Sequence, residues 1–247
     1  MLLALDTSSR WMGVALYDGA QVLFETVWHS PNYHTSQLAP VVSQALEHVG
    51  ALVSDLQAVG VALGPGGFTG LRVGLALAKG IVLAGHLPLI GIPSLEGLVA
   101  AQVAIDNSHN PECIVAVLQA GRERLAVGWY HLQNNRYVLK GDYEILLMSA
   151  LAERVIQYSQ SILVCGELND HDRRILAERI KSPLIASTTV GSKNVVSTAD
   201  DLPRRDVLIS SPAHSLRRPA YLAELAWKRW QSRDMDDPAT LVPIYLH

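Results

Sequence analysis

The sequence has little cysteine, no excess of either charge and no long uninterrupted apolar run. Its two cysteines, Cys113 and Cys165, lie far apart within apolar segments, which indicates small core side chains rather than a disulfide framework. The formal net charge of -3 lacks the positive excess that non-specific binding to nucleic acid requires. Basic pairs such as Arg217-Arg218 are expected on the solvated surface.

The apolar segments are also too short for a membrane span. The longest, 73–89, is interrupted by Lys79, Gly80 and Pro88 among others, whereas a helix needs about 20 apolar residues to cross a bilayer. Residues 1–6 enter an apolar run directly, with no basic segment before it and no cleavage site after it. We therefore expect a cytoplasmic protein with no membrane contact.

Motifs for metal binding and nucleophilic hydrolysis are missing as well. The 9 histidines form no His-x-x-x-His pair, and Leu38 stands where a second ligand would follow His34 on a helix. Segment 170–172, Asp-His-Asp, is expected to open a helix rather than to bind a metal. No Gly-x-Ser-x-Gly elbow occurs. The sequence thus predicts neither a metal site nor catalytic residues.

The first part of the chain, 1–106, predicts one α/β lobe in the order β-β-β-α-β-α-β-α. Asp18-Gly19 predicts a hairpin turn, because both positions tolerate positive φ. Ser94 is a natural N-cap for the third helix. The expected strands are 2–5, 11–17, 22–28, 58–63 and 87–91, and the expected helices are 36–49, 69–84 and one that follows Ser94.

After a polar segment at 107–111, predicted to be a linker, the pattern begins again. A shift of the chain by about 113 positions places Leu118-Gln119 on Leu5-Asp6, which suggests that 112–247 forms a second, degenerate lobe. The sequence does not decide which lobe the last helix packs on, and no structure is assigned to 187–215. Asn134-Asn135 predicts a turn between two of the strands of this half. The elements expected here are strands 113–118, 125–130, 137–147 and 162–165, and helices 150–158, 172–179 and 220–231.

The most unusual stretch is Gly-Pro-Gly-Gly-Phe-Thr-Gly-Leu-Arg at 64–72, between a buried strand and a helix. Amides at such a helix start can hold an anion, which makes Gly66, Gly67 and Thr69 candidate cofactor-binding residues. The stretch fails both nucleotide fingerprints, because no lysine follows it and Thr69 stands where the dinucleotide motif needs glycine. The alternative is structural: the glycines turn the strand sharply and bring two helices close together.

Asp6, just past the first strand, is a candidate to orient water or magnesium near a phosphate. The alternative is that the aspartate of Asp-Thr-Ser caps a turn. Its counterpart in the second half is Gln119, a neutral amide, which weakens an ATPase hypothesis based on two carboxylates.

Helix 69–84 is apolar nearly all round, with Arg72 and Lys79 as its charges. Such a helix must be covered on more than one side, by its own sheet and by either another helix or a second protein. Helix 36–49 is also poor in charge, so the two predict a docking surface. The longer helix has three stripes: Gly70, Gly74 and Ala78; Leu71, Leu75 and Val82; and Val73, Leu77, Ile81 and Ala84.

With these motifs assembled, the chain resembles the TsaB family of bacterial tRNA threonylcarbamoyladenosine biosynthesis proteins, formerly grouped with glycoprotease-like proteins. The similarity is dense over about the first 100 residues and thin from Ser149 onward. One departure is Gln-Ala-Gly-Arg at 119–122, where relatives often read Asp-Ala-Arg. The matching pieces are Leu-Ala-Leu-Asp-Thr-Ser-Ser at 3–9, His34-Thr35, the stretch 64–72 with the helix after it, Gly-Ile-Pro-Ser-Leu at 91–95, and the ending Pro243 to His247.

The resemblance implies a two-lobed actin-like, sugar-kinase-like (ASKHA, RNase H-like) fold with mixed sheets, in a catalytically degenerate member that binds no cofactor alone. It implies a non-catalytic scaffold subunit for TsaD, which transfers threonylcarbamoyl to adenosine of tRNA. TsaE joins the larger complex, TsaC makes the adenylate, and tRNA is contacted only indirectly. A homodimer is expected when the chain is alone.

On this hypothesis, helices 36–49 and 69–84 pack against the equivalent pair of TsaD. The rival hypothesis is a small ATPase or sugar-kinase-like phosphotransferase that uses Asp6 and the 64–70 loop, and a peptidase is a weaker third. The predicted interface residues are His34, Leu38, Val42, Gly70, Leu71, Gly74, Leu75, Ala78 and Val82.

Overall fold

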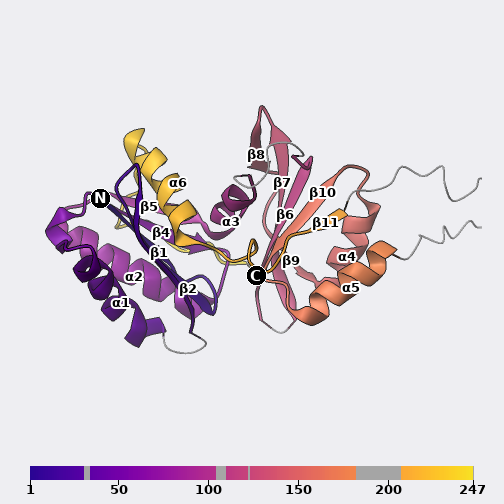
Figure 1. The fold of residues 1–247 in the computed structure, drawn as a ribbon, viewed down its shortest axis with the longest axis horizontal. Coiled ribbons are helices and arrows are strands. Elements are labelled where there is room, and N and C mark those ends of the chain that lie inside the picture. Colours follow the sequence, from indigo (N-terminus) through magenta and orange to yellow (C-terminus); the bar gives the residue numbers. More distant parts are fainter. Residues whose placement is uncertain (31–33, 104–109, 122, 182–206, 247) are drawn as a thin grey trace, which may run out of the picture.

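The chain forms two lobes, each built on a mixed sheet with helices on both faces (Figure 1). A computed structural model describes residues 1–30, 34–103, 110–121, 123–181 and 207–246. Helices α1 and α2 lie on the outer face of the first sheet, α4 and α5 on the outer face of the second, and α3 and α6 between the sheets (Figure 1). The linker predicted at 107–111 lies mostly outside the described residues.

The first sheet has the strand order β3-β2-β1-β4-β5. Strand β1 is antiparallel to β2 and parallel to β4, while β3 and β5 form the two edges. The elements of this part are β1 (Leu2–Asp6), β2 (Trp11–Tyr17), β3 (Val22–His29), α1 (His34–His48), a 3-10 turn (Val53–Asp55), β4 (Ala58–Gly64), α2 (Phe68–Gly85), β5 (Leu89–Pro93) and α3 (Ser94–Val103).

The second sheet has the order β11-β10-β6-β7-β8, with β9 also paired to β7. The single strand predicted at 137–147 is two strands, because Gly141 takes a φ of +76° between them and redirects the chain. The elements are β6 (Cys113–Gln119), β7 (Arg124–Gln133), β8 (Arg136–Leu139), β9 (Glu144–Leu147), α4 (Met148–Gln157), β10 (Ile162–Gly166), α5 (Asp170–Lys181) and β11 (Val207–Ile209).

The two lobes repeat one topology, as the sequence predicts. Strand β6 is antiparallel to β7 and parallel to β10, just as β1 is antiparallel to β2 and parallel to β4. Asp6 and Gln119 each end the first strand of their lobe. The predicted hairpin turns are also confirmed, because Gly19, Asn134 and Asn135 all have positive φ.

The last helix, α6 (Pro219–Gln231), packs on the first sheet. Its Leu222, Ala223 and Ala226 bury the inner face of that sheet, where side chains such as Leu2 alternate with those that face α1 and α2. The predicted second lobe at 112–247 therefore divides: the chain up to β11 builds the second sheet, and α6 returns to the first lobe.

The face that α2 turns toward the sheet is the stripe of small residues. A Cβ added at Gly70 would lie 2.1 Å from the carbonyl oxygen of Thr7, and one at Gly74 would lie 2.2 Å from Thr7 Oγ1. That hydroxyl donates a hydrogen bond to the Gly70 carbonyl at 2.7 Å. The glycines thus bring α2 against the chain segment after β1, and Gly70 also lies close to His34 at the start of α1, so the structural alternative of two helices brought together holds in part.

The predicted interface residues mostly face the interior of the first lobe. Eight of the nine are buried there, so other side chains make up the exposed part of the two helices, although Val42 still lines the groove between them. On α2, the contact with the Thr7 segment is so close that it needs the smallest residues of the helix. The buried eight are Leu38, Val42, Gly70, Leu71, Gly74, Leu75, Ala78 and Val82.

By length and composition, α2 is the one helix of the described residues that could cross a membrane, although the sequence predicted no such span. Its buried stripe packs on the sheet of the first lobe, with Leu75, Ala78 and Val82 in the same core as Leu3 and Leu5. Core packing on one face accounts for part of this apolar character.

Two glycine substitutions in α2 should move stability in opposite directions. Gly74→Ala should destabilise the fold by about 1–3 kcal/mol, because the new methyl group meets the Thr7 side chain. Gly80→Ala should be neutral or stabilise by up to about 1 kcal/mol, because a Cβ there meets nothing within 4 Å and alanine favours helix. Urea unfolding measures both, and equal midpoints for the two variants would contradict the packing.

Candidate functional site

The carboxylate of Asp6 has hydrogen-bond partners at both oxygens. Oδ1 accepts from the backbone N–H of Ser8 at 2.9 Å and from its hydroxyl at 2.5 Å. Oδ2 accepts from Nε of Arg217 at 2.9 Å. Asp6 is only 4% exposed. Of the two roles considered for it, it caps the turn after β1, and it is also half of a buried ion pair with Arg217, which the sequence did not predict.

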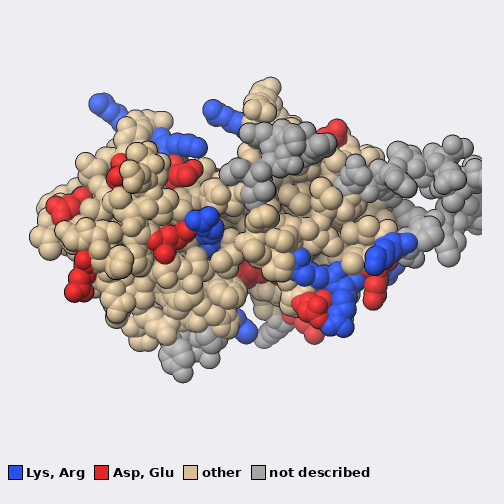
Figure 2. Space-filling model, in the orientation of Figure 1, with Lys and Arg blue, Asp and Glu red and all other residues tan. Residues whose placement is uncertain are grey.

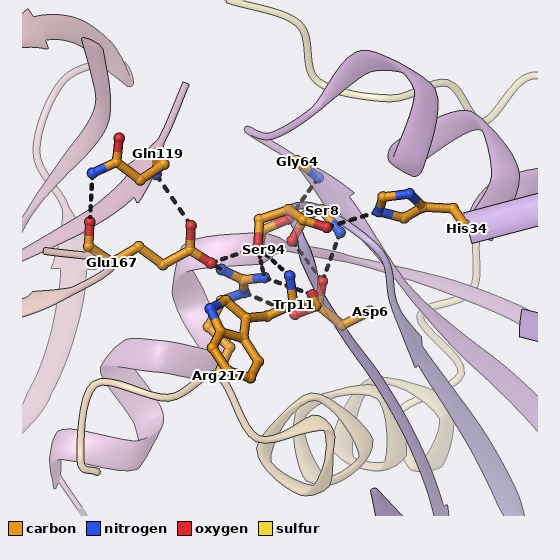
Figure 3. Close-up of polar contacts among 10 residues, drawn as sticks. Asp6, Ser8, Trp11, His34, Gly64, Ser94, Gln119, Glu167 and Arg217 are labelled. Atoms are coloured by element: carbon orange, nitrogen blue, oxygen red, sulfur yellow. Dashed lines mark hydrogen bonds and ion pairs between the residues drawn. The ribbon is translucent and has the colours of Figure 1, made fainter. Parts of the chain in front are cut away.

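Arg217 joins the two lobes (Figure 3). Besides Asp6 from the first lobe, its Nη1 binds Oε1 of Glu167 from the second lobe at 2.5 Å. Its Nη2 donates to the hydroxyl of Ser9 at 2.9 Å and to the carbonyl of Trp11 at 3.3 Å. One guanidinium thus binds two carboxylates and two neutral oxygens.

Burial works against the charge on Arg217, but Asp6 and Glu167 outweigh it and raise the pKa of the guanidinium above its ordinary value. The arginine stays charged and pairs with both carboxylates. The expectation that Arg217 lies on the solvated surface was wrong; its neighbour Arg218 is half-exposed and pairs with Glu25.

Glu167 and Arg217 are the functional candidates that sequence reasoning missed. Glu167 follows the end of β10, beside the end of β6 where Gln119 lies, and Gln119 Nε2 donates to its carbonyl at 3.0 Å. The ends of adjacent parallel strands meet at one sheet edge, so this signal was available. No sequence signal pointed to Arg217, because it lies 211 residues from Asp6 in a segment before α6.

The glycine-rich loop packs against the turn that follows Asp6. A Cβ on Gly66 would lie 2.2 Å from the Ser8 carbonyl, and the Gly67 N–H donates to that same oxygen at 2.7 Å. The Gly64 N–H donates to the Ser94 hydroxyl at 2.9 Å, so this hydroxyl binds the loop, whereas the sequence predicted it as a cap for α3. These contacts favour the structural interpretation of the loop.

A cleft of about 860 Å³ opens between the lobes in front of this loop. Of the candidate cofactor residues, Gly67 and Thr69 line the cleft, whereas Asp6 and Gly66 do not. His34, the ninth predicted interface residue, also lines it and donates through Nε2 to the Ser9 carbonyl at 2.9 Å. The described residues include no group of three His, Cys, Asp or Glu placed to hold a metal ion.

The outer face of α1 and α2 is a second surface, separate from the cleft. We name it the α1–α2 face; few charged side chains lie on the part of it visible in Figure 2. Between the helices runs a shallow groove of about 620 Å³, lined mainly by apolar residues. The exposed or half-exposed residues of the face include the charged Glu47 and Lys79 as well as Ala39, Ser43, Val73, Ala76, Leu77, Gly80, Ile81, Leu83 and Ala84.

Known proteins match this chain in sequence. The family model described as TsaD, tRNA N6-adenosine threonylcarbamoyltransferase, matches residues 29–160. The tRNA threonylcarbamoyladenosine biosynthesis protein TsaB of Bacillus subtilis is 26% identical over 245 residues, which cover 99% of this chain and 93% of the relative. The tRNA N6-adenosine threonylcarbamoyltransferase of Pelobacter propionicus is 33% identical over 113 residues, 39% of this chain and 33% of the transferase.

Solved structures match its fold. YeaZ from Pseudomonas aeruginosa superposes with a TM-score of 0.72 at 23% identity, covering 99% of both chains. A ROK family glucokinase from Streptomyces griseus, in complex with glucose and AMPPNP, gives a TM-score of 0.51 at 9% identity, covering 92% of this chain and 99% of the kinase. These likenesses confirm the predicted two-lobed, sugar-kinase-like α/β fold.

Substitution of Arg217 tests the cluster that joins the lobes. Arg217→Met should lower the free energy of unfolding by about 3–5 kcal/mol, because it leaves Asp6 and Glu167 buried without a counter-charge. Arg218→Met is the matched control and should cost less than about 1 kcal/mol, because its ion pair is half-exposed. Adding Asp6→Asn and Glu167→Gln to Arg217→Met should recover part of the loss, and equal denaturation midpoints for the two single variants would contradict the cluster.

Proposed function

The chain belongs to the TsaD family of tRNA N6-adenosine threonylcarbamoyltransferases, and we propose that it acts in tRNA threonylcarbamoyladenosine biosynthesis as the non-catalytic partner subunit of a TsaD transferase. Its likeness to a TsaB protein over nearly the full length of both chains agrees with the resemblance seen in its motifs. The partner role is the step that goes beyond family membership.

The observation that carries the partner role is the α1–α2 face. Leu83 is 66% exposed there, and Ala76 and Gly80 present almost no side chain. Small residues in one stripe let a second helix approach the backbone closely, while the half-buried Leu77 and Ile81 supply apolar contact. An uncovered face of this composition is typical of a protein interface.

A partner related in sequence fits this face. Part of the chain is similar to a transferase of the same family, and related chains present related helix pairs. Two such pairs pack about an approximate twofold axis, and two copies of this chain would pack in the same way. We therefore propose that TsaD and a second copy compete for the α1–α2 face, with a homodimer forming when TsaD is absent.

The non-catalytic part of the proposal is supported by the state of Asp6. A carboxylate that orients magnesium must be open to the cation, whereas Asp6 is buried, its Oδ1 accepts two hydrogen bonds from Ser8 and its Oδ2 is paired with the positive Arg217. We propose that the chain binds no cofactor alone, contacts tRNA only through the assembly that includes TsaE, and works in the cytoplasm.

A charge placed on the α1–α2 face should break the complex. Ala76→Glu should abolish co-purification with TsaD, because the carboxylate would be buried without a partner, while the thermal unfolding of the chain stays unchanged. Ser149→Glu, an exposed position on α4 of the second lobe, adds the same charge and should co-purify normally.

The same pair of variants gives a functional readout. Modification of tRNA reconstituted from TsaD, TsaE and TsaC should require this chain, should be lost with Ala76→Glu and should persist with Ser149→Glu. Full modification without the chain would refute the proposed role, and normal binding by Ala76→Glu would refute the proposed face.

The rival function, a small ATPase or phosphotransferase, makes the opposite prediction for the isolated chain. Calorimetric titration with ATP and magnesium should give no saturable heat, because a nucleotide-bound cation would have to displace Arg217 from Asp6. Tight binding that disappears in Asp6→Asn, a variant that keeps the shape of the side chain, would favour the rival instead.

A further inference from the structure

Three side chains form a cluster at the beginning of α2. The guanidinium of Arg72 lies over the ring of Phe68, with its carbon 3.7 Å from the ring centroid. Its Nε donates to the hydroxyl of Tyr245 at 3.0 Å, and the Phe68 and Tyr245 rings are 5.0 Å apart. We name these three residues the Arg72 cluster. Stacking and one hydrogen bond together hold the guanidinium in a single orientation.

Tyr245 is itself held in place by the C-terminal segment. The Ile244 N–H donates to the Leu63 carbonyl at 2.7 Å, at the end of β4. The segment passes so close to Gly64 that a Cβ there would lie 2.6 Å from the Ile244 carbonyl oxygen. The Arg72 cluster is therefore built on the rigid core of the first lobe rather than on a free tail.

The cluster has unused binding capacity. Phe68 is 53% exposed and Arg72 is exposed. Among the described residues, none accepts a hydrogen bond from Nη1 or Nη2 of Arg72. Two parallel N–H groups on one edge of a guanidinium match the two oxygens of a carboxylate.

The cluster is continuous with the α1–α2 face. Arg72, Ala76 and Gly80 follow one another at steps of four residues and are all exposed, so they form one stripe along α2. A helix that packs over Ala76 and Gly80 must pass beside Arg72. Arg72 and Lys79 are the charges of α2, while the acidic Glu47 of α1 lines the groove with Leu77 and Ile81 and not with Arg72. The surface that meets Arg72 is therefore expected to be acidic.

We infer that the Arg72 cluster is the charged anchor of this interface and binds a carboxylate side chain of TsaD in a bidentate ion pair. The inference rests on the proposed function and adds a specific contact to it. Because the guanidinium is already oriented by Phe68 and Tyr245, binding orders little that was free, which makes an anchor of this kind effective. Arginine and aromatic residues are also the commonest interface hot spots.

A single carboxylate suits the cluster better than a polyanion. Binding along a nucleic-acid backbone takes many cations, because affinity grows with the number of phosphates neutralised. Helix α2 offers Arg72 and Lys79, which lie seven residues or about 10 Å apart. One oriented guanidinium beside an exposed aromatic ring is instead a site for one planar anion.

The test is the affinity of purified TsaD for four variants, measured by calorimetry at several salt concentrations. Arg72→Ala should weaken binding about tenfold or more and flatten its dependence on salt. Arg72→Lys should lie between wild type and alanine, because it keeps the charge but loses the planar fork. Arg136→Ala, an exposed arginine on β8 of the second lobe, is the matched control and should bind like wild type. Ala76→Glu reports on the face as a whole.

Each outcome tests either the Arg72 anchor or the proposed α1–α2 interface. Loss of binding in Ala76→Glu together with normal binding in Arg72→Ala would overturn the anchor and leave the proposed interface standing. Normal binding in Ala76→Glu would overturn the interface and the anchor with it. If Arg72→Ala binds TsaD normally but the complex loses affinity for tRNA, the cluster recognises phosphate and the carboxylate inference is wrong.

Discussion

The buried guanidinium of Arg217 binds Asp6 and Glu167, which come from opposite lobes, and much of the molecule is arranged around that contact. Removing a charge from water is costly unless its partners are close and well oriented. The end of β1, the end of β10 and the segment before α6 must therefore converge on one point. This requirement fixes how the lobes meet and explains why α6 lies on the first sheet although it follows the second in sequence.

The same cluster determines what the cleft can do. Asp6 ends the first strand of its lobe, a position that invites a phosphate or a metal, but its oxygens already bind Ser8 and Arg217. The glycine-rich loop in front of it packs on the Ser8 carbonyl. The Arg217 cluster thus buries Asp6 away from the cleft, which Gly67 and Thr69 still line. The α1–α2 face is the surface that we propose meets a partner.

Helix α2 illustrates which structural features a sequence pattern can predict and which it cannot. Its composition predicted cover on more than one side; the first sheet and α1 cover part of it, and cover of the outer face stays a prediction. Which stripe faces the sheet could not be read from spacing alone, because glycines serve equally well against a partner or against the chain's own backbone. The structure shows that the glycine stripe faces the chain's own backbone, because the Thr7 carbonyl and hydroxyl lie close to Gly70 and Gly74. The third stripe, which includes Leu77, is mostly half-exposed, and the fully exposed stripe of Arg72, Ala76 and Gly80 was not among the three predicted.

Sequence alone determined the features that depend on neighbours along the chain. These are the alternating strands, the hairpin turns at Gly19 and at Asn134-Asn135, the repeat that aligns Asp6 with Gln119, and the motifs shared with a family. Tertiary structure alone decided the partner of Asp6, the outward stripe of α2 and the lobe that receives α6. The physical reason is that burial and charge pairing act through space, and Arg217 reaches Asp6 across 211 residues that no local pattern connects.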